Sequence, residues 1–205
     1  MKKKTEARRQ AIVDIAGELF GEMGFERASM SEICRRVGGS KATIYNYFPS
    51  KEVLFFEVMY QANQAQFVAI HEMLDQATDD VAEALRRFGE ALLPFIYSPD
   101  VMALRRLAVT NSVNAELGRT CYELGPKRSM DEISEFLRSA IERGQLRLCD
   151  PMAATYHLRG LLESELLDSL IFRLEEAISP ERIRDVVKRA IAVFMAAYGP
   201  VPATA

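Results

Sequence analysis

Residues 40–55, SKATIYNYFPSKEVLF, bring hydrogen-bonding side chains, aromatic rings and two lysines together in one short segment. Ser40 is a typical N-cap residue, and Pro49 disfavours helix in the residue before it, so the segment predicts a short helix that ends near Phe48. Ile44 and Phe48 are four residues apart and share one face of that helix. We therefore expect this apolar pair to anchor the helix while its polar side chains face outward.

Two further helices are predicted before this segment. One has an apolar stripe that ends at Gly24 and consists of Ile12, Ile15, Ala16, Leu19, Phe20 and Met23. Ser29-Met-Ser-Glu32 has the spacing of a capping box and begins a second, short helix that ends at Gly38-Gly39. Two short helices joined by a tight turn form a helix-turn-helix, whose second helix enters the major groove of DNA.

The side chains of the second short helix have the chemistry for DNA contacts. Its length of about 13 Å is close to the width of the major groove, about 12 Å. Asn46 can recognise adenine, and Thr43 can contact a thymine methyl group or a phosphate. The Tyr47 hydroxyl and the Lys51 ammonium group can hold phosphates. The alternative is that Tyr45, Tyr47 and Phe48 fill a small core.

Charge is distributed unevenly along the 205 residues, although the net charge is only −3. Residues 1–51 carry ten Lys and Arg against six Asp and Glu, a net charge of +4, whereas residues 52–205 carry 16 against 23, a net charge of −7. This division predicts a DNA-binding head over residues 1–51 and a separate regulatory module, to which we assign sensing and dimerisation below, over residues 52–205. A helix from residue 50 connects the two.

The remaining sequence predicts an all-α protein of about nine helices, in which a three-helix head precedes a larger bundle. Apolar residues recur at helical spacing almost throughout, and strand-like alternation is missing. The prolines predict where helices begin or bend: Pro94 inside a helix over 79–97, and first-turn prolines at Pro99, Pro126, Pro151 and Pro180. Three cysteines without C-x-x-C spacing, and no apolar run that could span a bilayer, favour a cytoplasmic protein without membrane contact.

Residues from Ile12 to about Met59, including AGELFGEMGFERASMSEICRRVGGSKATIYNYFPSKEVLF, resemble the DNA-binding domain of the TetR family of transcriptional regulators. The resemblance implies that Lys41, Thr43, Tyr45 and Asn46 approach bases or the adjacent backbone and that Tyr47 and Lys51 hold phosphates. It also implies that Ser29 and Ser31 touch the flanking backbone or a base, and Ser40 completes the predicted DNA-binding set. Gly39 and Ala42 depart from the usual pattern of the family.

A helix-turn-helix reads a palindrome only as a pair, so part of the chain must dimerise. In the TetR family the last two helices form a four-helix bundle across the dimer axis, and the helix after Pro151 carries two apolar faces. The predicted interface consists of Tyr156, Arg159, Glu163, Leu166, Leu167, Leu170, Val187, Ile191 and Phe194. The alternative is that these residues only fill the core of one protomer.

The resemblance to the TetR family also implies a cavity for a small effector in the second half of the chain, which faintly resembles the AefR-type subgroup of this family. The candidate lining residues are Phe88, Leu92, Phe95, Ile96, Tyr97, Met102 and Tyr122, which offer aromatic and flexible apolar surface. Pro94 removes one helix hydrogen bond beside them. The alternative is that these residues only fill the core. The expected effector is mostly apolar, and no cofactor is predicted.

Other polar candidates are weaker. The stretch HEMLD at 71–75 lacks the second histidine of a zinc-protease helix, so we expect a solvated helix face and no metal. His157, Arg159, Glu163 and Glu165 predict interface pairs or, alternatively, polar contacts with a ligand. Cys121 and Cys149 are expected to be inert thiols rather than redox sensors. The lysines at positions 2–4 predict either a minor-groove arm or a solvated start.

The sequence therefore predicts a homodimeric transcriptional repressor that binds a palindromic operator in double-stranded DNA and is released by a small effector. The alternative is a helical adaptor or enzyme whose basic head binds an acidic protein. Catalysis is not expected, because no nucleophile–base set, paired carboxylates, phosphate-binding glycine loop or metal spacing is present in the sequence.

Overall fold

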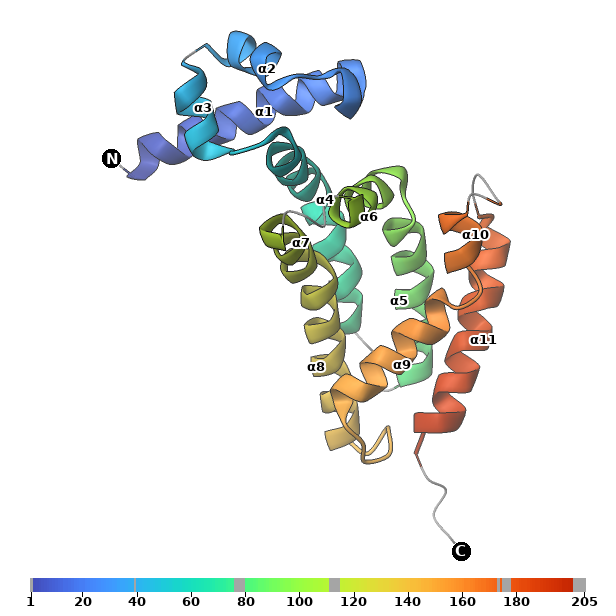
Figure 1. The fold of residues 1–205 in the computed structure, drawn as a ribbon. Helices are drawn as coiled ribbons and strands as arrows, with labels where there is room; N and C mark the ends of the chain where they lie inside the picture. The colour runs from blue at the N-terminus through green and yellow to red at the C-terminus, as the bar shows by residue number, and fades with distance from the viewer. Residues whose placement is uncertain are drawn as a thin grey trace, which may run out of the picture. The chain divides into compact units, whose positions relative to one another are not determined.

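The fold is described from a computed structural model of residues 2–38, 40–75, 80–110, 115–172, 174 and 178–200, with the side chains of residues 2–4, 75, 115, 116 and 170 left out. These residues form helices and contain no strand, which confirms the all-α prediction (Figure 1). The helices are α1 (Lys2–Arg27), α2 (Met30–Val37), α3 (Lys41–Tyr47), α4 (Lys51–Asp75), α5 (Val81–Ile96), α6 (Pro99–Thr110), α7 (Ala115–Tyr122), α8 (Arg128–Glu142), α9 (Pro151–Glu163), α10 (Leu167–Ile171) and α11 (Pro180–Tyr198), with a π-helical turn η1 (Glu123–Lys127) before α8. None of these helices combines the length and apolar character needed to cross a membrane.

The N-caps read from the sequence are present in the structure. The hydroxyl of Ser29 accepts a hydrogen bond from the amide of Glu32 at the start of α2, and Ser40 does the same for Thr43 at the start of α3. The side chains of Asp150 and Ser179 cap α9 and α11 in the same way. Each cap satisfies a backbone N–H that has no partner inside its helix and contributes about 1 kcal/mol.

The chain divides into two compact units at points that charge does not reveal. The first unit comprises Met1–Ala65 and Ala103–Cys121, and the second comprises Gln66–Met102 and Tyr122–Ala205. The predicted division at residue 51 differs from this, because the first half of α4 and most of α6 and α7 belong to the first unit. Leu107 and Leu117 are buried there beside residues of α1 and α4.

The core of the first unit holds the three-helix head together. Ile12, Ala16, Leu19 and Phe20 of α1 are buried, which confirms the predicted apolar stripe. Ile44 and Phe48 are almost completely buried in the same cluster, as the four-residue spacing of this pair predicts. One face of α3 therefore packs against the core, and the opposite face is exposed to solvent.

The core of the second unit is built mainly by α5, α8, α9 and α11. Gly89 allows α5 to lie close to two other helices, since a Cβ atom at this position would stand 3.0 Å from Leu162 and 3.1 Å from Val187. Phe88, Leu93, Leu137, Leu158 and Phe194 are fully buried around it. A close three-helix contact therefore lies at the centre of this unit.

Three proline positions test the predicted helix boundaries. Pro99 begins α6 as predicted, and Pro94 lies inside α5. Pro126 does not begin a helix, because it lies within η1, between α7 and α8. Proline lacks an N–H and its ring clashes with the carbonyl group one turn earlier, and a wider π turn relieves that clash without ending the helix. A separate α7 and a separate α10 account for the departure from nine predicted helices.

Candidate nucleic-acid interface

The turn between α2 and α3 depends on glycine. Gly38 has φ 68°, a conformation that side-chain-bearing residues rarely adopt, and its N–H donates to the carbonyl of Cys34 at 3.2 Å. The Arg8 guanidinium group donates a hydrogen bond to the Gly38 carbonyl. The turn is thus tied to α1, while Gly39 lies outside the described residues.

The predicted base-reading residues of α3 lie on its exposed face. The side chains of Lys41, Thr43, Tyr45 and Asn46 are exposed on the helix that buries Ile44. The Thr43 hydroxyl lies 2.8 Å from that of Ser40, so the cap orients it. The resulting surface presents an ammonium group, an amide and hydroxyl groups, which are the donors and acceptors that DNA base edges and phosphates bind.

Tyr47 is half-buried and packs against the core of the first unit, so its ring has a structural role whatever its hydroxyl contacts. Ser29 is exposed, but its hydroxyl is the N-cap acceptor of α2. Ser31 is exposed beside it. Ser29 and Ser31 lie at the start of α2, the other short helix of the helix-turn-helix.

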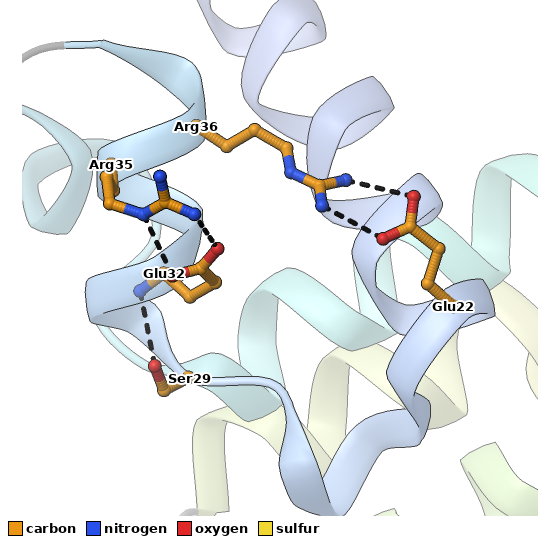
Figure 2. Close-up of polar contacts among 5 residues, drawn as sticks. All are labelled: Glu22, Ser29, Glu32, Arg35 and Arg36. Carbon is orange, nitrogen blue, oxygen red and sulfur yellow. Dashed lines mark hydrogen bonds and ion pairs between the residues drawn. The ribbon is translucent and has the colours of Figure 1, made fainter.

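An ion pair holds α2 against α1. Arg36 donates two hydrogen bonds to the carboxylate of Glu22, at 2.9 and 3.1 Å, as Figure 2 shows. Its hydrogen bonds hold the pKa of Glu22 below its ordinary value. Arg35 instead pairs with Glu32 on its own helix (Figure 2). The bidentate geometry of the first pair fixes orientation as well as distance.

A second ion pair links α1 to α4 inside the first unit. The guanidinium group of Arg9 is 2.7 Å from a carboxylate oxygen of Glu57 and lies 5.2 Å from the ring centre of Phe48. Burial alone would raise the pKa of Glu57, but hydrogen bonds from Arg9 and Gln61 hold it below its ordinary value. The guanidinium group of Arg9 therefore covers Phe48, one of the two residues that anchor α3.

The ammonium group of Lys51 faces the protein's own backbone. Its Nζ donates to the carbonyl groups of Phe25, at 2.9 Å, and Ala28, at 3.2 Å. The sequence predicts a phosphate contact for this lysine and contains no sign of these two acceptors. Lys2, Lys3 and Lys4 continue the backbone of α1, and their side chains lie outside the described residues.

The predicted effector-binding residues fall into two groups in the second unit. Phe88, Leu92 and Phe95 are buried in the core of this unit, and Ile96 and Tyr97 are partly buried against it. Met102 is buried without belonging to that cluster. Tyr122 stays 46 % exposed, so it does not join them. A surface hollow of about 490 Å³ lies elsewhere in this unit, lined by Asp80, Val81, Ala82, Gln145, Met195 and Pro200.

A polar network that the sequence does not reveal crosses this apolar core. The carboxylate of Glu163 on α9, which is only 8 % exposed, accepts hydrogen bonds from the Tyr97 hydroxyl at 3.2 Å and from Arg159 Nε at 2.8 Å. Arg159 also contacts the sulfur of Met130 at 3.8 Å. Arg159 and Glu163 therefore pair within one protomer, although the sequence favours them as interface residues.

His71 is buried, which corrects the solvated helix face predicted for residues 71–75. Its ring is 4 % exposed and stacks on Phe67 with ring centres 4.1 Å apart. Nδ1 donates to the Phe67 carbonyl, so the neutral ring accepts from the Ser129 hydroxyl at Nε2, each at 2.8 Å. Burial lowers the pKa of His71, against the effect of Glu132 nearby. Glu72 and Met73 are exposed as expected.

Most of the apolar residues predicted for the dimer interface are buried within their own protomer. Leu166, Val187, Ile191 and Phe194 belong to the core of the second unit, because α11 turns its apolar stripe towards α5 and α9. Tyr156 is 53 % exposed and Leu167 is half-buried. The side chain of Leu170 lies outside the described ones.

Among the residues that the structure describes, the thiols and acidic groups form no arrangement suited to metal binding. Within the described part of the chain, no group of three or more His, Cys, Asp or Glu side chains could hold a metal ion. Burial raises the pKa of Cys121 to about 11 and also raises that of Cys149. A raised pKa keeps a thiol protonated and therefore a poor nucleophile.

Two family models together match most of the chain. Residues 12–58 match the bacterial regulatory proteins of the tetR family, and residues 83–200 match the C-terminal domain of AefR-like transcriptional repressors. Among curated relatives, the HTH-type transcriptional regulator YhgD of Bacillus subtilis is 24 % identical over 181 residues, covering 84 % of this chain and 87 % of that protein. Family models and relatives alike are transcriptional regulators, not enzymes.

Solved structures agree with these matches. A TetR-family regulator from Mesorhizobium loti is 26 % identical, with a TM-score of 0.79 over 95 % of this chain and 98 % of that one. The flavonoid-responsive regulator FrrA is 29 % identical, with a TM-score of 0.70 and the same coverage. The helix-turn-helix head, the exposed face of α3 and a family model over more than half of the chain converge, and the chain belongs to the TetR family of DNA-binding transcriptional regulators.

Proposed function

We propose that this regulator is a cytoplasmic homodimeric repressor that holds a palindromic operator and releases it when a small, mostly apolar effector binds. The observation that carries this proposal is the two-sided α3, which buries Ile44 and exposes Lys41, Thr43 and Asn46. Such a helix reads only a few base pairs, so selective binding in a genome requires a second copy related by symmetry.

The outward faces of α9 and α11 support dimerisation through these helices. α9 exposes Tyr156 and Gly160, its C-cap Ser164 is also exposed, and α11 exposes small apolar side chains, among them Ala192 and Val193. Small side chains allow two helices to approach closely, and the exposed rings and methyl groups gain free energy when water is removed from them. We therefore assign the dimer contact to these outward residues in place of the buried Val187, Ile191 and Phe194.

The effector site is proposed in the core of the second unit, beside the Tyr97–Glu163–Arg159 network. Aromatic side chains such as Phe95 offer an apolar molecule a large contact surface, and the network offers it a hydroxyl group and a guanidinium group. Because FrrA is named as flavonoid-responsive, flavonoids are the first compounds to test.

In this proposal, effector binding and operator binding are thermodynamically coupled. The effector releases DNA only if it binds the DNA-incompetent conformation better than the competent one. Linkage then requires that operator binding weaken effector binding by the same factor. Effector affinity measured with and without operator duplex tests this equality directly.

The operator is tested by selecting bound duplexes from a random library with purified protein at moderate salt. We expect a palindrome whose half-sites lie about one helical turn apart or more. Recovery of a single asymmetric half-site would contradict the dimeric reading. Recovery of no preferred sequence, with and without the compounds tested, would contradict operator recognition.

The effector is tested by adding flavonoids to the complex of protein and selected duplex while following fluorescence anisotropy. We expect release of the duplex by at least one compound, and a weaker response in a Phe95→Trp variant that still binds the duplex normally. If Phe95→Trp also loses DNA binding, the residue supports the fold instead of the effector site.

A further inference from the structure

The Lys51 side chain is hydrogen-bonded to the backbone where α1 ends and the chain passes to α2. We propose that Lys51 is a positioning residue, which acts on DNA binding by holding the connection between α1 and α2 instead of gripping a phosphate itself. The ammonium group has three N–H donors, and two of them are directed at the carbonyl oxygens of Phe25 and Ala28. The side chain is half-buried, unlike that of Lys41 on α3.

The connection that Lys51 holds is a short helical turn, in which the Ala28 amide donates to the Gly24 carbonyl at 3.2 Å. α1 is interrupted at Gly24, where φ is 77° and ψ is 161°. Carbonyl groups at the end of a helix have no partner within it, and a nearby cation stabilises them by hydrogen bonding and by its charge. Lys51 supplies both to Phe25 and Ala28, from the first turn of α4.

The aromatic ring of Phe25 strengthens this contact. The ammonium group lies 4.2 Å from the centre of the ring, a geometry that favours cation–π attraction. The same ring packs on Phe55 of α4, with centres 4.8 Å apart, and lies 6.1 Å from Phe20 of α1. Phe25 is thus held by the core on one side and by the lysine on the other.

The position of the loop determines where α2 begins. Ala28 directly precedes Ser29, whose hydroxyl caps α2 at the amide of Glu32. α2 in turn leads through Gly38 to α3, so a shift at Ala28 changes the placement of both helices of the helix-turn-helix. Lys51 therefore acts on the DNA-reading surface through the backbone.

Three variants separate positioning from a direct phosphate contact. Lys51→Met keeps most of the apolar stem and removes the donors. Phe25→Leu removes the ring and changes no charge, so a direct phosphate contact would survive it. Lys41→Met is the matched control, because it makes the same chemical change at an exposed position. The probe is a fluorescein-labelled duplex of the sequence that the wild-type protein selects, titrated between about 50 and 200 mM salt.

We expect Lys51→Met and Phe25→Leu each to weaken duplex binding by about tenfold, the effect of losing a charged hydrogen-bond pattern. The dependence of log affinity on log salt should stay at the wild-type slope in both. Hydrogen exchange should become faster in backbone amides of residues 25–32 in both variants and stay unchanged in Lys41→Met.

A direct phosphate contact predicts a different result. Lys51→Met would then lower the salt slope by about 0.9, the contribution of one phosphate, and Phe25→Leu would bind like the wild type. Either of those observations, or wild-type exchange rates over residues 25–32, overturns the proposal. If Lys51→Met does not fold, Phe25→Leu decides alone: weaker binding at an unchanged slope supports positioning, and wild-type affinity refutes it.

Discussion

Replacing Gly89 by alanine sets two effects of opposite sign against each other. Alanine is favoured over glycine inside a helix by about 1 kcal/mol. The new Cβ atom, however, would stand 3.0 Å from Leu162 Cδ2 and 3.1 Å from Val187 Cγ1, and both side chains are almost completely buried. Overpacking a tight core costs about 1–3 kcal/mol, so we expect Gly89→Ala to lower the free energy of unfolding by about 1 kcal/mol.

Gly21→Ala is the matched control, because Gly21 is an exposed helical residue and a Cβ atom there would meet nothing within 4 Å. Without the steric cost, this variant should be stabilised by up to about 1 kcal/mol. Unfolding in urea measures both variants, at equal protomer concentration because the proposed dimerisation would be linked to folding. In a thermal scan the expected loss in Gly89→Ala corresponds to about 2–4 °C.

The comparison between the two variants carries the test. If Gly89→Ala is as stable as Gly21→Ala, or more stable than the wild type, then α5 does not pack as closely against α9 and α11 as the structure shows. If Gly89→Ala is destabilised and the slope of unfolding free energy against urea is unchanged, the cost arises in the native core.

Three further outcomes are expected. In duplex selection, Asn46→Ala should relax the preference at one base position by about 1–3 kcal/mol, and an unaltered preference profile in this variant contradicts base reading. Tyr47→Ala should instead weaken binding to all duplexes alike. Because burial lowers the pKa of His71 below 6.5, the unfolded chain binds its proton more readily, so stability should fall as pH drops below about 6.5. In urea unfolding at several pH values, His71→Gln should lose less stability than the wild type as the pH drops. An equal loss of stability in both proteins would refute the assignment. Val193→Asp on the outer face of α11 should shift the protein to monomer in sedimentation, whereas a stable dimer would place the interface elsewhere.

Much of the head could be predicted because its determinants are local. The N-caps Ser29 and Ser40, the burial of Ile44 with Phe48, and the outward polar set on α3 all follow from spacing within a few residues. Helical periodicity places side chains on faces without reference to the rest of the chain. The all-α class follows from the same periodicity.

The remaining features depend on partners that are distant in the sequence. Periodicity identifies the apolar stripe of α11, but α5 and α9 of the same protomer cover Val187 and Phe194. A buried position for His71 requires Ser129, 58 residues later, to complete its hydrogen bonds. The membership of α6 and α7 in the first unit likewise depends on packing against α1 and α4.

By itself, then, the sequence determined most of the helices, their caps and the exposed face of α3, because each of these depends on neighbours within one or two turns. Only the tertiary structure decided that Lys51 bonds to the carbonyl groups of Phe25 and Ala28 and that Glu163 accepts from Tyr97. A cation or a carboxylate takes whichever partners the fold brings within about 3 Å, and that selection is made by the packing of the whole unit.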